Sequence, residues 1–94
     1  MSLPFKSWSP MPRFYLDLFL GSQSNLDEEG HEIGSLRAVE IEALRTAGEL
    51  ARDRLFTMRE ANAEDIRVEV KDEHRRPILT VTISIRVDRS GQRS

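Results

Sequence analysis

The chain has 94 residues, with 14 Lys and Arg against 16 Asp and Glu, so it is long enough for one small domain and carries a formal net charge of −2. It contains no cysteine, which excludes disulfides and thiolate metal sites. No region has the excess positive charge typical of nucleic-acid-binding proteins, and no apolar run approaches the roughly 20 residues that span a bilayer.

Residues 1–12 are predicted to form an irregular tail, because the prolines at positions 4, 10 and 12 can neither continue a helix nor donate to a strand ladder. Prolines and Lys6 also interrupt any apolar run of the kind that signal peptides contain. We therefore expect a cytoplasmic protein without a membrane segment, and Met11 is an alternative start to Met1.

Residues 13–20 alternate between two faces, as a half-buried strand does. The side chains predicted to face the core are Phe14, Leu16, Leu18 and Leu20, and those predicted to face outward are Tyr15, Asp17 and Phe19. Residues 21–25 are predicted to be a loop, residues 27–30 a turn with a glycine at its end, and residues 31–33 a short extended piece.

A helix is predicted from Ser35 to about Ala61, with Ser35 as its N-cap. At helical spacing, one apolar stripe is formed by Leu36, Val39, Ala43, Ala47, Leu50 and Met58. Gly48 falls beside this stripe, and we expect it to pack closely against a neighbouring element.

Three further apolar residues of the helix, Ile41, Leu44 and Leu55, fall outside the stripe, so the apolar arc is wider than one sheet needs. Two interpretations are open. Loops or the N-terminal segment could cover these side chains, or a second copy of the protein could do so and form a homodimer.

Residues 66–71 and 78–87 alternate as two further strands, and the short connection between them predicts an antiparallel hairpin. Residues 62–65 break the pattern before the first of these strands. In the longer strand, the residues predicted to face inward are Leu79, Val81, Ile83, Ile85 and Val87. Residues 89–94 are predicted to be a polar tail.

These elements predict a single α+β domain over residues 13–88, a two-layer sandwich with one long helix on one face of a sheet. The predicted sheet has three main strands and one short strand, in the chain order β, short β, α, β, β. We expect the long last strand at the centre of an antiparallel sheet. A right-handed crossover that places the first strand parallel to the second main strand is the alternative.

Several blocks of the sequence together resemble a family of small proteins that share a domain of unknown function and are common in rhizobia and related alphaproteobacteria. The blocks are Met11–Leu18 with its Met-Pro-Arg-Phe-Tyr opening, Asp27–Ile33, Ser35–Leu44, Val70–Glu73 and Arg76–Val81. The resemblance implies a bacterial source and a cytoplasmic setting, and it brings no known activity or catalytic residues. One departure is that a glycine would be expected in the closing turn, where this chain has His74 and Arg75.

Metal and catalytic chemistry find little support in the sequence. The two histidines, His31 and His74, fall in separate turns and would need to converge with a carboxylate from residues 27–29 to bind a metal ion. Glycine-rich phosphate loops and nucleophile elbows do not occur. We therefore predict a protein that is not an enzyme and has no cofactor.

The outer face of the sheet is a second candidate surface. Its members are Tyr15, Phe19, Arg67, Lys71 and Arg86, with Thr80 and Thr82 beside them. Aromatic and basic side chains on a sheet can stack single-stranded nucleotides. Alternatively, these residues form ordinary cross-strand pairs, with Glu69 and Asp17 neutralising the basic groups.

Two functional hypotheses follow. The preferred one is a small non-catalytic module that self-associates or binds another protein. It is supported by the wide apolar arc of the helix, with Ile41, Leu44 and Leu55, and by a long, exposed strand edge. The alternative is a nucleic-acid-associated regulator that uses the outer sheet face.

Overall fold

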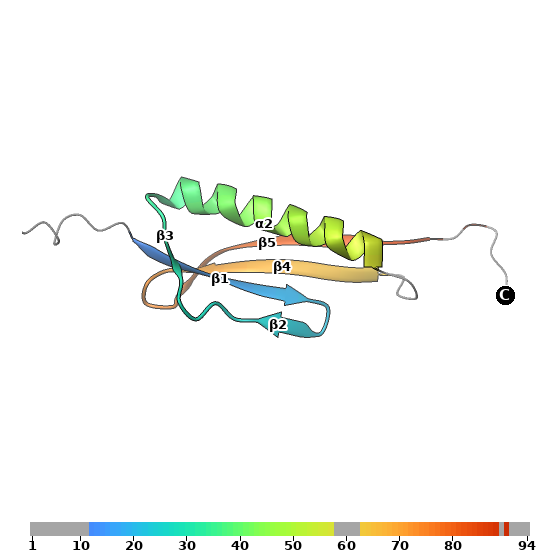
Figure 1. Ribbon diagram of the computed structural model, residues 1–94, viewed down its shortest axis with the longest axis horizontal. Coiled ribbons are helices and arrows are strands. Elements are labelled where there is room, and N and C mark those ends of the chain that lie inside the picture. The colour runs from blue at the N-terminus through green and yellow to red at the C-terminus, as the bar shows by residue number, and fades with distance from the viewer. Residues whose placement is uncertain (1–11, 58–62, 89, 91–94) are drawn as a thin grey trace, which may run out of the picture.

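The computed structural model describes residues 12–57, 63–88 and 90, and it confirms the predicted α+β sandwich with one helix over one face of an antiparallel sheet (Figure 1). The elements are β1 (Arg13–Leu20), β2 (Gln23–Asn25), β3 (His31–Glu32), α2 (Leu36–Thr57), β4 (Ala63–Lys71) and β5 (Pro77–Arg86). The predictions for residues 1–11, for Met58 and for most of the C-terminal tail lie outside the described residues.

The strand order is β2-β1-β4-β5, with β3 also paired to β1, and every pairing is antiparallel. The predicted central position of the long last strand is wrong, because β5 lies at the edge and β4 lies between β1 and β5. Val68 of β4 is opposite Leu18 on one side and Val81 on the other, and its side chain is fully buried. Strand length therefore does not identify the central strand here.

Two stretches predicted to be irregular are part of the sheet. β2 pairs with the end of β1 across a turn in which Gly21 has a φ of 60°, and residues 63–65 are the first residues of β4 and pair with the end of β5. β2 is polar and exposed along its whole length, and two of the three residues 63–65 are acidic. They carry no alternating apolar pattern, and their place in the sheet comes from pairing with β1 and β5.

The core lies between α2 and the inner face of the sheet, as predicted. Its buried members include Phe14, Leu16, Val39, Ala43, Ala47, Val68 and Val70. The small side chains of Ala43 and Ala47 let the helix lie close to the strands. Leu36 was predicted to be part of this stripe, but it stands exposed at the open first turn of α2.

Local hydrogen bonds explain how α2 begins and how the last hairpin closes. The Ser35 hydroxyl accepts a hydrogen bond from the Ala38 N–H at 3.0 Å, which confirms the predicted N-cap. In the closing turn, the Asp72 carboxylate accepts from the N–H groups of His74 and Arg76 at 2.8 and 2.9 Å. Arg75 adopts a φ of 67°, so the tight turn forms with an arginine in the conformation that favours glycine.

The two edges of the sheet differ. On the outer side of β1, the short strands β2 and β3 cover its two ends, and an Asp27 side-chain oxygen accepts from the Leu16 N–H between them at 3.1 Å. On the outer side of β5, the part of the chain that the structure describes supplies no pairing strand. β5 is therefore an edge strand of ten residues.

Candidate functional site

The outer sheet face brings together part of the predicted aromatic and basic group. Tyr15 is opposite Lys71, and Phe19 is opposite Arg67, across the β1–β4 pair. Arg86 lies apart, because it is opposite Ala63 at the far end of β4. The structure thus supports two aromatic–basic pairs, and it separates Arg86 from them.

Each of the three basic residues predicted for this face has an acidic neighbour. The Lys71 Nζ lies 2.7 Å from Asp17 Oδ2, and the Arg67 Nε lies 2.8 Å from Glu69 Oε2. The Arg86 Nε lies 3.3 Å from Asp88 Oδ1. These pairs neutralise the charges that a phosphate backbone would contact.

The aromatic rings of the same face are also covered. The Arg67 guanidinium lies 4.4 Å from the centre of the Phe19 ring, and the Arg75 guanidinium lies 3.9 Å from the centre of the Tyr15 ring. A base could stack on either ring only after the arginine moved away.

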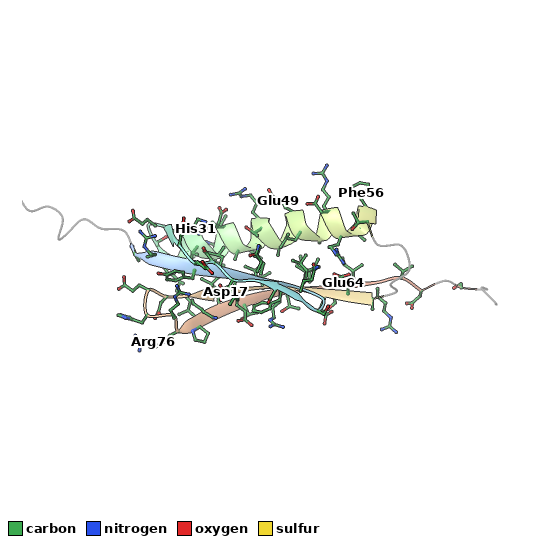
Figure 2. All side chains as sticks on the ribbon, turned by 60° about the horizontal axis from the view of Figure 1, so that its bottom comes forward. Asp17, His31, Glu49, Phe56, Glu64 and Arg76 are labelled. Atoms are coloured by element: carbon green, nitrogen blue, oxygen red, sulfur yellow. The ribbon has the colours of Figure 1, made fainter. Side chains whose placement is uncertain are left out.

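Asp17 and Asp27 form a polar cluster between β1 and the loop after β2. This cluster was not predicted from the sequence. Only 2% of the Asp17 surface is exposed, and its carboxylate accepts a hydrogen bond from the Asp27 N–H at 2.9 Å besides its ion pair with Lys71 (Figure 2). Alternation placed Asp17 correctly on the outward face of β1, but it gave no sign that a loop would bury it there.

The Asp27 carboxylate itself accepts hydrogen bonds from two backbone N–H groups. Burial opposes its ionisation, but hydrogen bonds from the N–H groups of Gly30 and Leu16, together with nearby His31, outweigh burial and lower the pKa of Asp27 below its ordinary value. This cluster ties the loop to β1, so we assign it a structural role.

The two histidines are held by separate neighbours. His31 Nδ1 lies 3.2 Å from Asp27 Oδ2, while His74 Nε2 lies 3.9 Å from Glu73 Oε2 in the closing turn. Among the described residues, no group of three His, Cys, Asp or Glu side chains could hold a metal ion.

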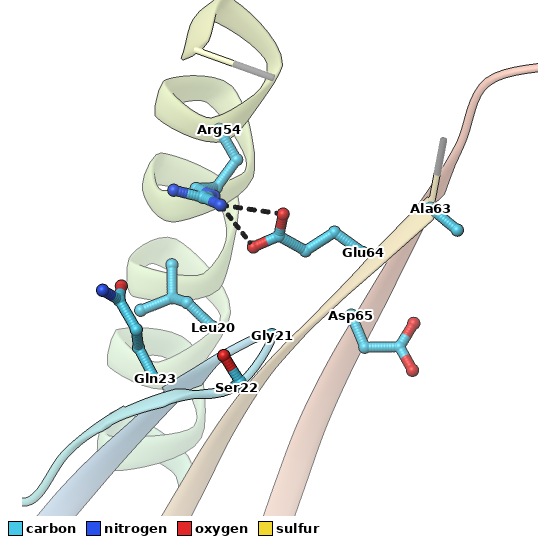
Figure 3. Close-up of a pocket in the computed structure, with 8 residues that line it drawn as sticks. All are labelled: Leu20, Gly21, Ser22, Gln23, Arg54, Ala63, Glu64 and Asp65. Carbon is cyan, nitrogen blue, oxygen red and sulfur yellow. Dashed lines mark hydrogen bonds and ion pairs between the residues drawn. The ribbon is translucent and has the colours of Figure 1, made fainter. Parts of the chain in front are cut away.

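A polar hollow lies at the far end of the molecule, between the end of α2, the β1–β2 turn and the start of β4 (Figure 3). Here one nitrogen of Arg54 lies 2.8 Å from each carboxylate oxygen of Glu64. The hydrogen bond to Glu64 raises the pKa of Arg54, and the pair fastens the end of the helix to the sheet. Among the described residues, Arg54 Nε and Glu64 Oε2 are buried without a hydrogen-bond partner, while Arg54 donates its one hydrogen bond in this pair to Glu64 Oε1. Because the pair links the helix to the sheet, we assign it to the fold.

The predicted self-association residues lie in solvent on α2. Ile41 is 51% exposed, Leu44 is 52% exposed and Leu55 is 58% exposed. Gly48 shares their side of the helix, and a Cβ added to it would meet no atom within 4 Å. The close packing predicted for Gly48 is therefore wrong within the described chain, and we call these four residues the helix flank.

The helix flank faces the β5 side of the molecule. The buried stripe of Ala43 and Ala47 faces the sheet, while Glu42 and Thr46 line a hollow together with Leu16 of β1. Because those two residues define the β1 side of α2, the opposite flank lies toward β5. Phe56, 75% exposed, points away from the sheet and does not belong to the flank (Figure 2).

Comparison with family models shows which family the chain resembles. The model of a domain of unknown function, DUF6894, matches residues 13–84, from the start of β1 to near the end of β5. No curated protein matched the chain, and no solved structure matched it. No helix in the described ranges is long and apolar enough to cross a membrane.

Proposed function

The chain belongs to the DUF6894 family, and we propose that it is a small non-catalytic module that self-associates or binds another protein through α2. The observation that carries this proposal is the helix flank, where Ile41, Leu44 and Leu55 each expose about half of their surface. Grouped apolar side chains of this kind in water favour a partner surface.

The outer sheet face favours this proposal indirectly. Arg67 and Lys71 are paired with carboxylates, and the rings of Phe19 and Tyr15 are covered by arginines. The polar hollow at Arg54 and Glu64 is likewise occupied by an ion pair. Of these three surfaces, the helix flank is the one whose apolar side chains have no partner among the described residues.

Light scattering after size exclusion tests the proposal on the full chain at tens of micromolar. The expected mass is twice 10.8 kDa for the wild-type chain, and Leu44→Glu is expected to return it to 10.8 kDa because a carboxylate in an apolar interface is strongly disfavoured. Ala38→Glu is the control, since Ala38 is exposed and lies on a different side of the helix. Equal masses for the wild-type chain and Leu44→Glu would contradict a role for this flank in self-association.

A nucleic-acid-associated regulator is the second candidate, and the register of Phe19 with Arg67 and of Tyr15 with Lys71 favours it. The net charge of −2 and the paired basic residues weigh against it.

An alphaproteobacterial source and a cytoplasmic setting, which the sequence resemblance implies, stay predictions.

A further inference from the structure

We propose that two copies of this chain join through the outer edge of β5, so that their sheets become continuous and their α2 helices pack antiparallel through the helix flank. This inference rests on the proposed self-association and adds its geometry. The partner surface on each copy is then β5 together with Ile41, Leu44, Gly48 and Leu55.

The edge of β5 has the properties of a strand that accepts another strand. Its ten residues run Pro-Ile-Leu-Thr-Val-Thr-Ile-Ser-Ile-Arg, with no charge before the final Arg86. Natural edge strands are usually shielded by charges, bulges or short length. In β5 such features lie near the two ends, with Pro77 and a shift of register at Ile78 at the start and Arg86 at the end. The other edge of the sheet is formed by β2 and β3, which are three and two residues long.

The symmetry of such a strand pairing determines how the two α2 helices are placed in the dimer. Two copies of one strand that pair antiparallel are related by a two-fold axis perpendicular to the sheet. This axis reverses the strand direction and keeps the same face of both sheets upward. Both α2 helices therefore lie on one side of the joined sheet, antiparallel, with their β5-side flanks toward each other.

The spacing between the helices also fits. α2 contacts both β4 and β5, so its axis lies above the space between these two strands. With strands about 4.8 Å apart, this position is about 5 Å from the two-fold axis, and the two helices are about 10 Å apart. Packed helices have axes 8–10 Å apart, so joining the strands brings the helices to contact distance.

The sequence of the flank is self-complementary in this arrangement. Ile41 and Leu55 stand seven residues before and after Gly48. When antiparallel helices cross at Gly48, Ile41 of each copy lies beside Leu55 of the other. Gly48 lies at the closest point, where the absence of a side chain allows the backbones to approach.

The two elements are also matched in length and direction. α2 has 22 residues and β5 has ten, which gives about 33 Å for each at their usual rises per residue. They run in the same direction along the molecule (Figure 1). One two-fold axis near the middle of both elements can therefore serve the strand pair and the helix pair.

The test combines spin-label distances with two adjacent substitutions in the full chain. Because the chain has no cysteine, single labels can be placed at Thr82→Cys on β5 and at Ser24→Cys on β2, both exposed. If the copies join through β5, the two labels at position 82, one in each copy, lie within about 15 Å of each other. The two labels at position 24 lie about 34 Å apart, because seven strand spacings separate β2 of one copy from β2 of the other. Leu55→Glu should give monomer, whereas Phe56→Glu, one residue further and about 100° around the helix, should stay dimeric.

Each outcome separates this geometry from self-association itself. A dimer with distant labels at position 82, or one that Leu55→Glu leaves intact, would overturn the β5 geometry while the proposed self-association stood. A monomer for the wild-type chain would overturn both, and would leave the flank to the chain's own N-terminal segment or to another protein.

Discussion

Asp27 fills the gap that β2 and β3 leave along the outer side of β1. One of its oxygens accepts from the Leu16 N–H at 3.1 Å and the other from the Gly30 N–H at 2.9 Å. A single acidic side chain thus takes the place of a strand residue at this edge, and the loop after β2 depends on it.

We expect Asp27→Asn to lower the free energy of unfolding by about 2 kcal/mol at pH 7, because an amide offers one acceptor oxygen where the carboxylate offers two. The exposed neighbour Glu28 provides the control as Glu28→Gln, with an expected change within about 0.5 kcal/mol. Urea unfolding followed by circular dichroism at equal protein concentration measures both.

The same residue makes stability depend on acid pH. The pKa of Asp27 is lowered in the folded chain, so its contribution is present above the unfolded pKa of about 4 and is lost as pH falls through the lower folded pKa. The difference between wild type and Asp27→Asn should therefore shrink from pH 7 to pH 3. An unchanged difference would show that the ionised form is not what stabilises the loop.

Arg75 stores conformational strain in the closing turn, with a φ of 67°. Arg75→Val and Arg75→Gly both remove the guanidinium from the Tyr15 ring, but only glycine adopts a positive φ without a steric cost. We expect the valine variant to be less stable than the glycine variant by about 1–2 kcal/mol. Thermal or urea unfolding of the pair measures this, and equal stabilities would contradict the left-handed conformation at this position.

At the scale of elements, α2 lies close to the sheet because Ala43 and Ala47 are fully buried and small. Ala47→Leu adds volume where the strands leave none, so we expect the free energy of unfolding to fall by about 1–3 kcal/mol. Ala38→Leu, at an exposed position, is the matched control and should be close to neutral. Similar effects from the two variants would place the buried face of α2 elsewhere.

Periodicity predicted the elements that carry an apolar pattern. β1 and α2 follow their alternating and helical spacing closely, and the Ser35 cap confirms where the helix begins. β2 was missed because Gln23, Ser24 and Asn25 are all polar and exposed. Its pairing with β1 depends on the Gly21 turn and on tertiary contact, which local pattern does not report.

The order of the strands could not be read from the chain in the same way. β4 and β5 both alternate between apolar and polar residues, and β5 is the longer. What places β4 inside the sheet is that it pairs on both sides, with Leu16 opposite Val70 on one side and Val81 opposite Val68 on the other. The position of a strand in the sheet depends on its pairing with strands that are distant in the sequence. Strand length alone therefore predicted the wrong central strand.

Across the whole molecule, the sequence predicted which apolar helix residues lie outside the core, but it did not predict which residues contact each other across the fold. It singled out Ile41, Leu44 and Leu55 as outside the core stripe, and the structure places them in solvent. It did not foresee the burial of Asp17, nor that Gly48 would face open space. Both depend on which neighbours arrive from distant parts of the chain.

The nucleic-acid alternative has its own test. We expect filter binding to single-stranded RNA at low salt to show weak affinity, because Arg67 and Lys71 of the outer face are paired with carboxylates. If binding is found, stacking requires that Tyr15→Ala with Phe19→Ala reduce it by at least tenfold, since base–aromatic stacking contributes about 1–3 kcal/mol per base. Tight binding lost in this double variant would favour the regulator over the interaction module.

We expect this family member to self-associate, and the mass of the wild-type chain in solution decides whether it does. We would measure light scattering after size exclusion over a concentration series from a few to several hundred micromolar. Self-association gives a mass that rises with concentration from 10.8 kDa toward twice that value. A mass that stays at 10.8 kDa across the whole series would contradict it.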